Sequence, residues 1–235
     1  MAAPQPLTLY LKPGACSLAP HSVLAHVGLG YKIVLMKQAA NGNSTYSRYE
    51  AADGSLPHDE FLKINPKGFV PTLVLGEGSD AVITEMPAVM TYIGSIAPQD
   101  LNLLGTDIIS RAKVVEWLAW LSGAVHSNGF GAFWRPGRFA DDSNAETMQN
   151  IRRRGEEVLT KAFATIEGKL EGKEFAVGEA LTVVDFLLFV LWWWWYGLKP
   201  QSKEKYPNYA RLAQKVRALD GVNKAIVAEG IRVEL

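Results

Sequence analysis

The chain has 235 residues, of which 48% are hydrophobic, and its 24 basic and 24 acidic side chains give a formal charge of zero. This composition excludes wholesale disorder and gives no reason to expect nucleic acid or an anionic membrane as a partner. The single cysteine excludes an intramolecular disulfide and favours a reducing, cytoplasmic compartment.

The first hundred residues alternate between short apolar runs and helical patterns, which is typical of an α/β domain. Strands are predicted at residues 7–11, 31–36, 70–75 and 81–83, and helices at 17–29 and 87–96. The polar stretch 38–57 is predicted to be a loop, and a connection of that length is typical of a functional segment.

The composition changes at residues 97–107, which are the predicted linker. All later elements are predicted to be helices, at residues 108–133, 145–170, 182–196, 206–218 and after Gly221. Residues 1–97 are therefore predicted to form an α/β domain and residues 107–235 an all-α domain. The longest apolar run, 186–196, is too short for a membrane span and predicts a buried helix, which a capping box at 182–185 begins.

Cys16 lies between the first strand and the first helix. Backbone N–H groups and the dipole at a helix N-terminus favour an anion and lower the pKa of a thiol. Cys16 is therefore a candidate catalytic residue, either as a thiolate or as a hydrogen-bond donor to the thiolate of a ligand. A small buried hydrophobic residue is the other interpretation of this position.

Two further segments precede or follow strands in ways that suit a peptide-like ligand. Pro71 interrupts a strand pattern, and a cis Val70-Pro71 bond would leave the backbone of Val70 for an extended ligand, whereas a trans bond would simply end the strand. Glu85 and Met86 begin a helix, where free N–H groups can hold a carboxylate and Glu85 an ammonium group. Ordinary helix capping by Thr84 is the alternative.

His126 lies in or just after the first long helix of the second half, where it could hold a thiolate, shuttle a proton, or simply pack. Phe130, Phe133 and Trp134 follow at helical spacing and suit either the wall of an apolar substrate pocket or plain core. The four histidines and the lone cysteine lack a compact metal-ligand pattern, so no metal site is predicted.

The order of these motifs resembles the cytosolic glutathione transferases, and most of all their bacterial beta class. The resemblance is carried by residues 9–21 (LYLKPGACSLAPH), 65–73 (NPKGFVPTL), 84–93 (TEMPAVMTYI), 117–135 and the capping box 182–185. It spans essentially the whole chain.

This resemblance implies an N-terminal thioredoxin-like domain, a C-terminal all-helical domain, a homodimer and reduced glutathione as cosubstrate. It implies that Cys16 lies next to the glutathione sulfur, with Ser17 as a rival for that contact, and that His126 lies near the sulfur or near the glycyl end of glutathione. The implied glutathione site comprises Lys67, Phe69, Val70, a cis Pro71, Glu85 and Met86. The implied substrate pocket comprises Tyr10, Phe130, Phe133 and Trp134.

The predicted function is thus activation of the glutathione thiolate for attack on a small hydrophobic electrophile. Three alternatives use the same site: a glutathione-dependent isomerase, a thiol–disulfide or peroxide reductase acting through Cys16, and a non-catalytic binder of glutathione and hydrophobic ligands. Two departures from the family pattern keep the binder open as an alternative: Met86 replaces a common serine, and Ser127 stands where the beta class often has lysine.

Overall fold

The computed structural model describes residues 6–39, 48–76, 81–141 and 144–235. Its first part is a mixed five-stranded sheet with the strand order β3-β2-β1-β4-β5. The strands are β1 (Leu7–Leu11), β2 (Tyr31–Gln38), β3 (Tyr49–Ala51), β4 (Thr72–Leu75) and β5 (Val82–Thr84). β1 pairs in parallel with β2 and antiparallel with β4, so the strand that leads to Cys16 lies at the centre of the sheet.

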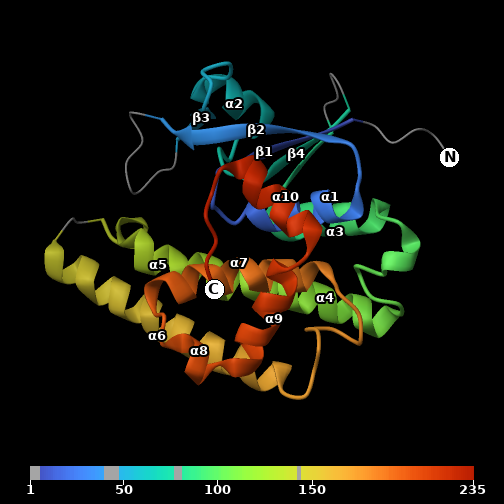
Figure 1. Ribbon diagram of the computed structural model, residues 1–235. Helices are drawn as coiled ribbons and strands as arrows, with labels where there is room; N and C mark the ends of the chain where they lie inside the picture. The colour runs from blue at the N-terminus through green and yellow to red at the C-terminus, as the bar shows by residue number, and fades with distance from the viewer. Residues whose placement is uncertain (1–5, 40–47, 77–80, 142–143) are drawn as a thin grey trace.

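Helices cover both faces of this sheet. Figure 1 shows α2 (His58–Ile64) above the sheet and α1 (Leu18–Val27) and α3 (Met86–Ile96) below it. Leu9 and Leu11 are buried in the large core on the α1 side, whereas Tyr10 packs against Phe61 of α2, with 5.6 Å between ring centroids. This division follows the two-residue alternation of a β-strand.

The second part of the chain is helical. Its elements are α4 (Ile108–Trp120), η2 (Leu121–Phe130), α5 (Gly131–Trp134), η3 (Pro136–Arg138), α6 (Ala145–Leu170), α7 (Val183–Leu198), α8 (Ser202–Lys205), α9 (Pro207–Arg217) and α10 (Asp220–Glu229). A one-turn 3₁₀ helix, η1 (Gln99–Leu101), lies in the connection from α3. None of the helices within the described ranges is long and apolar enough to cross a membrane.

Helix α7 is the centre of the helical layer, as its sequence predicts. Trp192 and Trp195 are buried, and a capping box opens the helix. The buried carboxylate of Asp185 accepts hydrogen bonds from the N–H of Ala176 (2.8 Å), the N–H of Thr182 (2.7 Å) and the hydroxyl of Thr182 (3.0 Å). Burial raises the pKa of Asp185 to about 6, while these hydrogen bonds act to lower it.

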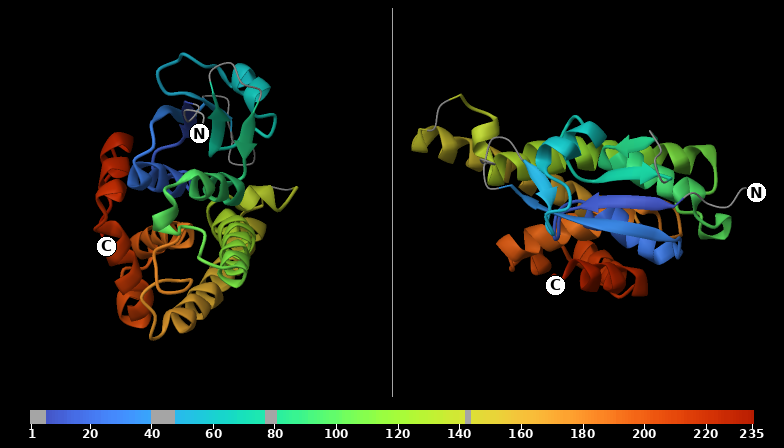
Figure 2. Two further views of the ribbon diagram at one scale, coloured as in Figure 1. Left: turned by 90° about the vertical axis from the view of Figure 1, so that its right-hand side faces the viewer. Right: turned by 90° about the horizontal axis from the view of Figure 1, so that it is seen from above.

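The last helix returns to the first domain. Both Figure 1 and Figure 2 place α10 beside α1, and a Cβ atom added to Gly221 would lie only 2.4 Å from the Cα of His26, so only glycine permits this approach. Below the surface, Glu229 of α10 accepts a hydrogen bond from the Gly14 N–H (2.9 Å) and pairs with His21 Nδ1 (2.8 Å). The end of the chain therefore braces the segment that carries Cys16.

The structure differs from the sequence prediction in three places. Helix α2 was not predicted. The stretch 38–57, predicted as a loop, contains β3, and its residues 40–47 lie outside the described ranges. The predicted helix 108–133 is a continuous run of α4, η2 and α5 whose middle part is π-helical. The division into domains at residues 97–107 stays a prediction.

Candidate functional site

A cavity of about 680 Å³ opens between the carboxyl end of β1, the loop before β4 and the η2–η3 region. Its volume lies within the range of about 300–1,000 Å³ typical of small-molecule sites. Ten residues predicted for the site line it: Cys16, Lys67, Phe69, Val70, Pro71, Glu85, Met86, His126, Phe130 and Trp134. The fold thus brings together motifs that are more than a hundred residues apart.

Cys16 lies at the cavity wall and is 7% exposed. Its Sγ donates a weak hydrogen bond to the carbonyl oxygen of Val70 at 3.7 Å. Burial raises the pKa of the Cys16 thiol to about 11, although the charge of Arg135 and backbone hydrogen bonds act to lower it. The predicted lowering of the thiol pKa at the helix N-terminus is therefore wrong: burial outweighs the N-terminal field, and Cys16 is a neutral hydrogen-bond donor near pH 7.

Three predicted site residues do not line this cavity. The hydroxyl of Ser17 is buried and exchanges hydrogen bonds of 3.2 Å with the backbone N–H and C=O of Lys12. Tyr10 lies on the α2 face of the sheet, because strand alternation points it away from the face that packs on α1. Phe133 packs against the main core, whereas Phe130 and Trp134 on either side of it face the cavity.

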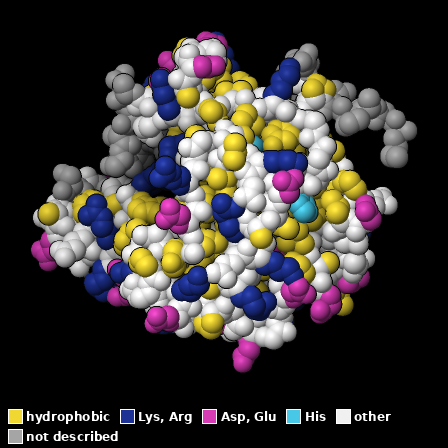
Figure 3. Space-filling view, viewed as in Figure 1, with side chains coloured by type: hydrophobic (Ala, Val, Ile, Leu, Met, Phe, Trp, Pro, Cys, Tyr) yellow, Lys and Arg dark blue, Asp and Glu magenta, His cyan; other side chains and the backbone are white. Residues whose placement is uncertain are grey.

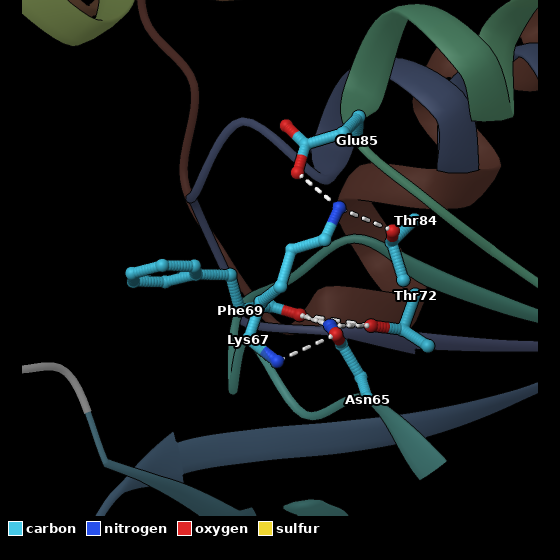
Figure 4. A network of polar contacts seen from close by, with 6 residues as sticks. All are labelled: Asn65, Lys67, Phe69, Thr72, Thr84 and Glu85. Carbon is cyan, nitrogen blue, oxygen red and sulfur yellow. Dashed lines mark hydrogen bonds and ion pairs between the residues drawn. The ribbon is translucent and has the colours of Figure 1, made fainter.

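The loop before β4 holds the cis Val70-Pro71 bond that the resemblance implies. Figure 4 shows how Asn65 ties this loop together: its amide donates to the Phe69 carbonyl (2.9 Å) and to the Thr72 hydroxyl (2.8 Å). The N–H of Lys67 donates to the Asn65 side-chain oxygen at 3.1 Å. These bonds fix the backbone at Val70 against the cavity.

Glu85 lies across the cavity, at the N-terminus of α3. Its φ of 68° is in the left-handed region, which costs a non-glycine residue about 1–2 kcal/mol. Its carboxylate pairs with Lys67 Nζ at 2.7 Å, and the same amine donates to the Thr84 hydroxyl at 2.8 Å (Figure 4). Glu85, not Thr84, is the N-cap residue of α3, and its side chain accepts no hydrogen bond from the first N–H groups of the helix. Strain of this kind is typical of a functional position.

His126 reaches the cavity from η2. Burial, reinforced by the charges of Arg135 and Arg138, lowers the pKa of His126 to about 4, so its imidazole is neutral near pH 7. The backbone carbonyl of His126 accepts a hydrogen bond from the N–H of Gly131, five residues later, which is the spacing of a π-helix. A Cβ atom on Gly155 would lie 2.8 Å from the Gly129 carbonyl, so this glycine lets α6 pack tightly against the segment that carries His126.

An aromatic wall faces the polar side of the cavity. The rings of Phe130 and Trp134 stack at 4.8 Å between centroids, and Trp194 of α7 packs edge-on against both, at 5.3 Å and 5.1 Å. The indole N–H of Trp194 donates to the Gly14 carbonyl at 3.0 Å, which links this wall to the segment before Cys16. The wall gives an apolar ligand a rigid surface.

Sequence reasoning missed Tyr49, Arg135, Arg138 and Phe139, all of which line the cavity. The guanidinium of Arg138 lies 5.5 Å from the centroid of the Phe69 ring, and Arg135 Nη2 is 3.5 Å from the Tyr49 hydroxyl. The two arginines flank a proline and a glycine directly after the predicted aromatic residues, and this was the available signal. Within the described ranges, no group of three or more His, Cys, Asp or Glu residues could hold a metal ion.

A thioredoxin-like sheet that presents a cysteine, a cis-proline loop and a helix N-terminus to a cavity closed by a helical domain defines a class of thiol-binding proteins. Family models place the chain within that class: residues 14–96 match the glutathione S-transferase N-terminal domain, and residues 133–220 match the glutathione S-transferase C-terminal domain. The chain belongs to the glutathione S-transferase family.

Individual relatives are similar to this chain over nearly its full length. Glutathione S-transferase GstA of Escherichia coli O157:H7 is 29% identical over 230 residues, covering 96% of this chain and 100% of GstA. A sphingomonad glutathione S-transferase solved in complex with glutathione is 27% identical, with a TM-score of 0.74, and covers 96% of this chain and 100% of its own. A bacterial beta-class transferase of Sphingomonas chungbukensis is 26% identical, with a TM-score of 0.75 and the same coverage.

These findings confirm the predicted fold class, with an N-terminal thioredoxin-like domain and a C-terminal helical domain. They also confirm the predicted enzyme class, a glutathione transferase.

Proposed function

We propose that this cavity binds reduced glutathione and activates its thiol for attack on an electrophile held against the aromatic wall. The observation that carries the proposal is the convergence of Cys16 Sγ, the Val70 backbone and the Glu85 carboxylate on one cavity. The glutathione complex of the sphingomonad relative supports the choice of thiol.

The polar groups on the sheet side suit the ends of an extended γ-glutamyl tripeptide. Glu85 would hold the ammonium group, and the first N–H groups of α3, beginning at Met86, would hold the neighbouring carboxylate. The backbone of Val70 would pair with the cysteinyl residue, as in the addition of a short strand. Replacement of the usual serine by Met86 removes a hydroxyl contact and leaves these N–H groups in place.

Activation requires that the thiolate be favoured over the thiol. A free thiol titrates near 8.5, so about two units of pKa depression are needed for it to be mostly ionised at pH 7, which corresponds to roughly 2.7 kcal/mol. The neutral Cys16 thiol can donate a hydrogen bond to a sulfur beside it, and Arg135 already acts to lower the pKa of the Cys16 thiol. His126, being neutral, would contribute an N–H donor rather than a charge.

The raised pKa of Cys16 distinguishes between the transferase and the reductase that acts through Cys16. A reductase that attacks through Cys16 needs a thiolate, and burial keeps Cys16 protonated, so the donor role is favoured over the redox role. We further propose a homodimer in the cytoplasm, as expected from the sequence. Exposed apolar side chains on α4 support a subunit interface: Ile108 is 84% and Ile109 71% exposed.

Calorimetric titration with reduced glutathione tests the proposal. We expect one saturable site per chain in the wild type and at least tenfold weaker binding in Glu85→Gln, because the ammonium group loses its counter-charge. Glu157→Gln, which alters an exposed carboxylate on α6, is the matched control and should bind as the wild type does. Absence of binding at millimolar glutathione, or equal affinity in Glu85→Gln, would contradict the proposed site.

A further inference from the structure

Tyr49 belongs to the connection 38–57, which the sequence predicts to be functional. It is the first residue of β3 and pairs with Gln38, the last residue of β2. Because β2 runs parallel to β1, this end of β2 lies at the same edge of the sheet as the turn that carries Cys16. Tyr49 lines the cavity and is 3% exposed, so its side chain is almost completely shielded from bulk water.

The Tyr49 side chain is held in place from two sides. Its backbone carbonyl accepts a hydrogen bond from Nδ1 of His58 at 3.0 Å, and its ring belongs to a small buried core with Met36 and Phe61. From the η3 side, Nη2 of Arg135 donates to the Tyr49 hydroxyl at 3.5 Å. These contacts keep the hydroxyl at one place in the cavity wall, as a group that acts on a substrate requires.

The Tyr49 hydroxyl keeps its own proton for a further hydrogen bond. A phenolic hydroxyl donates one hydrogen bond and also accepts, whereas a guanidinium only donates. The contact with Arg135 therefore uses an acceptor position of the hydroxyl, and among the residues that the structure describes no side chain or carbonyl accepts the Tyr49 proton. Donation from Arg135 polarises the hydroxyl and strengthens it as a donor. An oxygen of a molecule bound in the cavity can accept this hydrogen bond.

The hydroxyl lies beside the aromatic wall. Its partner Arg135 directly follows Trp134, one of the three rings of that wall. The Cys16 thiol and the Val70 carbonyl border the same cavity. Figure 3 shows a hollow near α5 with hydrophobic and basic side chains at its edge, which agrees with this arrangement. An electrophile packed on the wall can therefore direct one oxygen to Tyr49 while its reacting carbon faces a sulfur beside Cys16.

We propose that Tyr49 is a further catalytic residue, whose hydroxyl donates a hydrogen bond to a carbonyl oxygen of the second substrate. The substrate class that follows is an apolar enone, in which the carbon attacked by sulfur is conjugated to that carbonyl. The kinetic part of this inference rests on the proposed function, whereas the binding of the carbonyl does not. The rival interpretation is that Tyr49 donates to an oxygen of glutathione, and the experiment separates the two.

The addition needs no third reactant besides water. The glutathione sulfur bonds to the β-carbon, the electron pair of the carbon–carbon double bond moves toward the carbonyl, and a negative enolate oxygen forms where the Tyr49 hydroxyl donates. The α-carbon then takes a proton from water, and the proton released when the glutathione thiol ionised neutralises the hydroxide. No group leaves. A hydrogen bond aimed at the enolate oxygen stabilises the transition state more than the ground state, and so it raises the rate.

Two electrophiles that share a phenyl ring test the inference. Benzylideneacetone is an enone, whereas in benzyl chloride the sulfur displaces chloride and no oxygen gains charge. In Tyr49→Phe we expect kcat/KM for the enone to fall at least about tenfold, because a donor aimed at a developing oxyanion contributes more than an ordinary hydrogen bond. The kcat/KM for benzyl chloride and the calorimetric affinity for glutathione should stay within about twofold of the wild type. Tyr196→Phe, on α7 and outside the cavity lining, is the matched control and should keep both rates.

The saturated ketone benzylacetone, which does not react with a thiol, reports the hydrogen bond without glutathione. Its carbonyl stretch is read by difference infrared spectroscopy with a carbon-13 label. The stretch should lie at a lower frequency in the wild-type complex than in hexane, because a hydrogen bond weakens the carbonyl double bond, and it should return toward the hexane value in Tyr49→Phe.

Three results would overturn the inference: an enone rate that Tyr49→Phe leaves unchanged, an equal loss with both electrophiles, or a carbonyl stretch in the wild type equal to that in hexane. An equal loss that accompanies weaker glutathione binding would assign the hydroxyl to glutathione. A lowered carbonyl stretch in a wild type that binds no glutathione would support the inference and refute only the proposed function. The wild-type spectrum requires no variant, so it tests the inference whether or not Tyr49→Phe folds.

Discussion

A protonated Cys16 can act as a hydrogen-bond donor, whereas a redox nucleophile must be a thiolate. The rate of alkylation of Cys16 measures directly how much of it is thiolate. The chain has one cysteine, so uncharged iodoacetamide reports this thiol alone. A pKa of about 11 in place of the ordinary 9.0 lowers the thiolate fraction about a hundredfold at pH 8, to roughly one molecule in a thousand. A more basic thiolate is also a better nucleophile, by somewhat less than tenfold for two pKa units.

The net expectation is alkylation at least about tenfold slower than that of an unstructured peptide cysteine at the same pH, before any further slowing by burial. The logarithm of the rate should rise with a slope of one from pH 7 to pH 10 and reach no plateau. The same protein unfolded in guanidinium chloride is the control, and it should react as a free cysteine does.

A plateau below pH 9 would refute this reasoning. It would mean that the N-terminal field of α1 and the charge of Arg135 outweigh the burial of Cys16, and the thiol–disulfide alternative would then become the better account of the site.

Three further predictions concern stability and binding. Glu85→Gly relieves a left-handed φ of 68° and should raise the free energy of unfolding by about 1 kcal/mol in urea while glutathione binding falls; equal stability would contradict the strain argument. Asp185→Ala leaves buried N–H groups without an acceptor and should cost about 2–4 kcal/mol; a loss below about 1 kcal/mol would mean that the box contributes little. His126 binds a proton near pH 6.5 when unfolded but near pH 4 when folded, so the unfolded state holds more protons in between. Stability should fall as pH falls through that window, by at most about 3 kcal/mol, and less in His126→Gln; identical pH profiles would show that His126 is not buried as described.

Features set by neighbouring residues could be predicted from sequence. The capping box that begins α7 needs only residues three apart, and the burial of α7 follows from its uninterrupted apolar run. Strand β1 and the glycine that ends α1 are likewise local signals, with Gly28 in the left-handed conformation at the C-cap. The presence of a binding site could be predicted only from the order of several weak motifs, not from any one of them.

Features set by packing could not be predicted in the same way. Cys16 and Ser17 are adjacent, yet one side chain lines the cavity and the other turns to Lys12, because the turn between β1 and α1 points them in different directions. The side of η2 that lines the cavity could not be predicted from a period of 3.6 residues, because π-helical turns rotate every later side chain around the helix axis. The sign of the Cys16 pKa shift depended on how deeply the tertiary structure buries the thiol, which no local pattern reports.

Tyr10 is a different case, because strand alternation was sufficient to place it. Leu9 and Leu11 belong to the main core, so the residue between them had to face the opposite side of the sheet. The two arginines that flank the Pro136-Gly137 turn were also visible in the sequence, but their meaning required the cavity they line.

The central claim is that this cavity holds glutathione and stabilises its thiolate. The most direct test is to titrate bound glutathione by its thiolate ultraviolet absorbance in the Cys16→Ser variant, which has no thiol of its own and keeps a hydroxyl donor at this position. The account predicts that the pKa of the bound thiol lies well below the free value of about 8.5. Saturable binding with a bound thiol that titrates as it does in free solution would contradict the claim, because the cavity would then be a binding site without thiol activation.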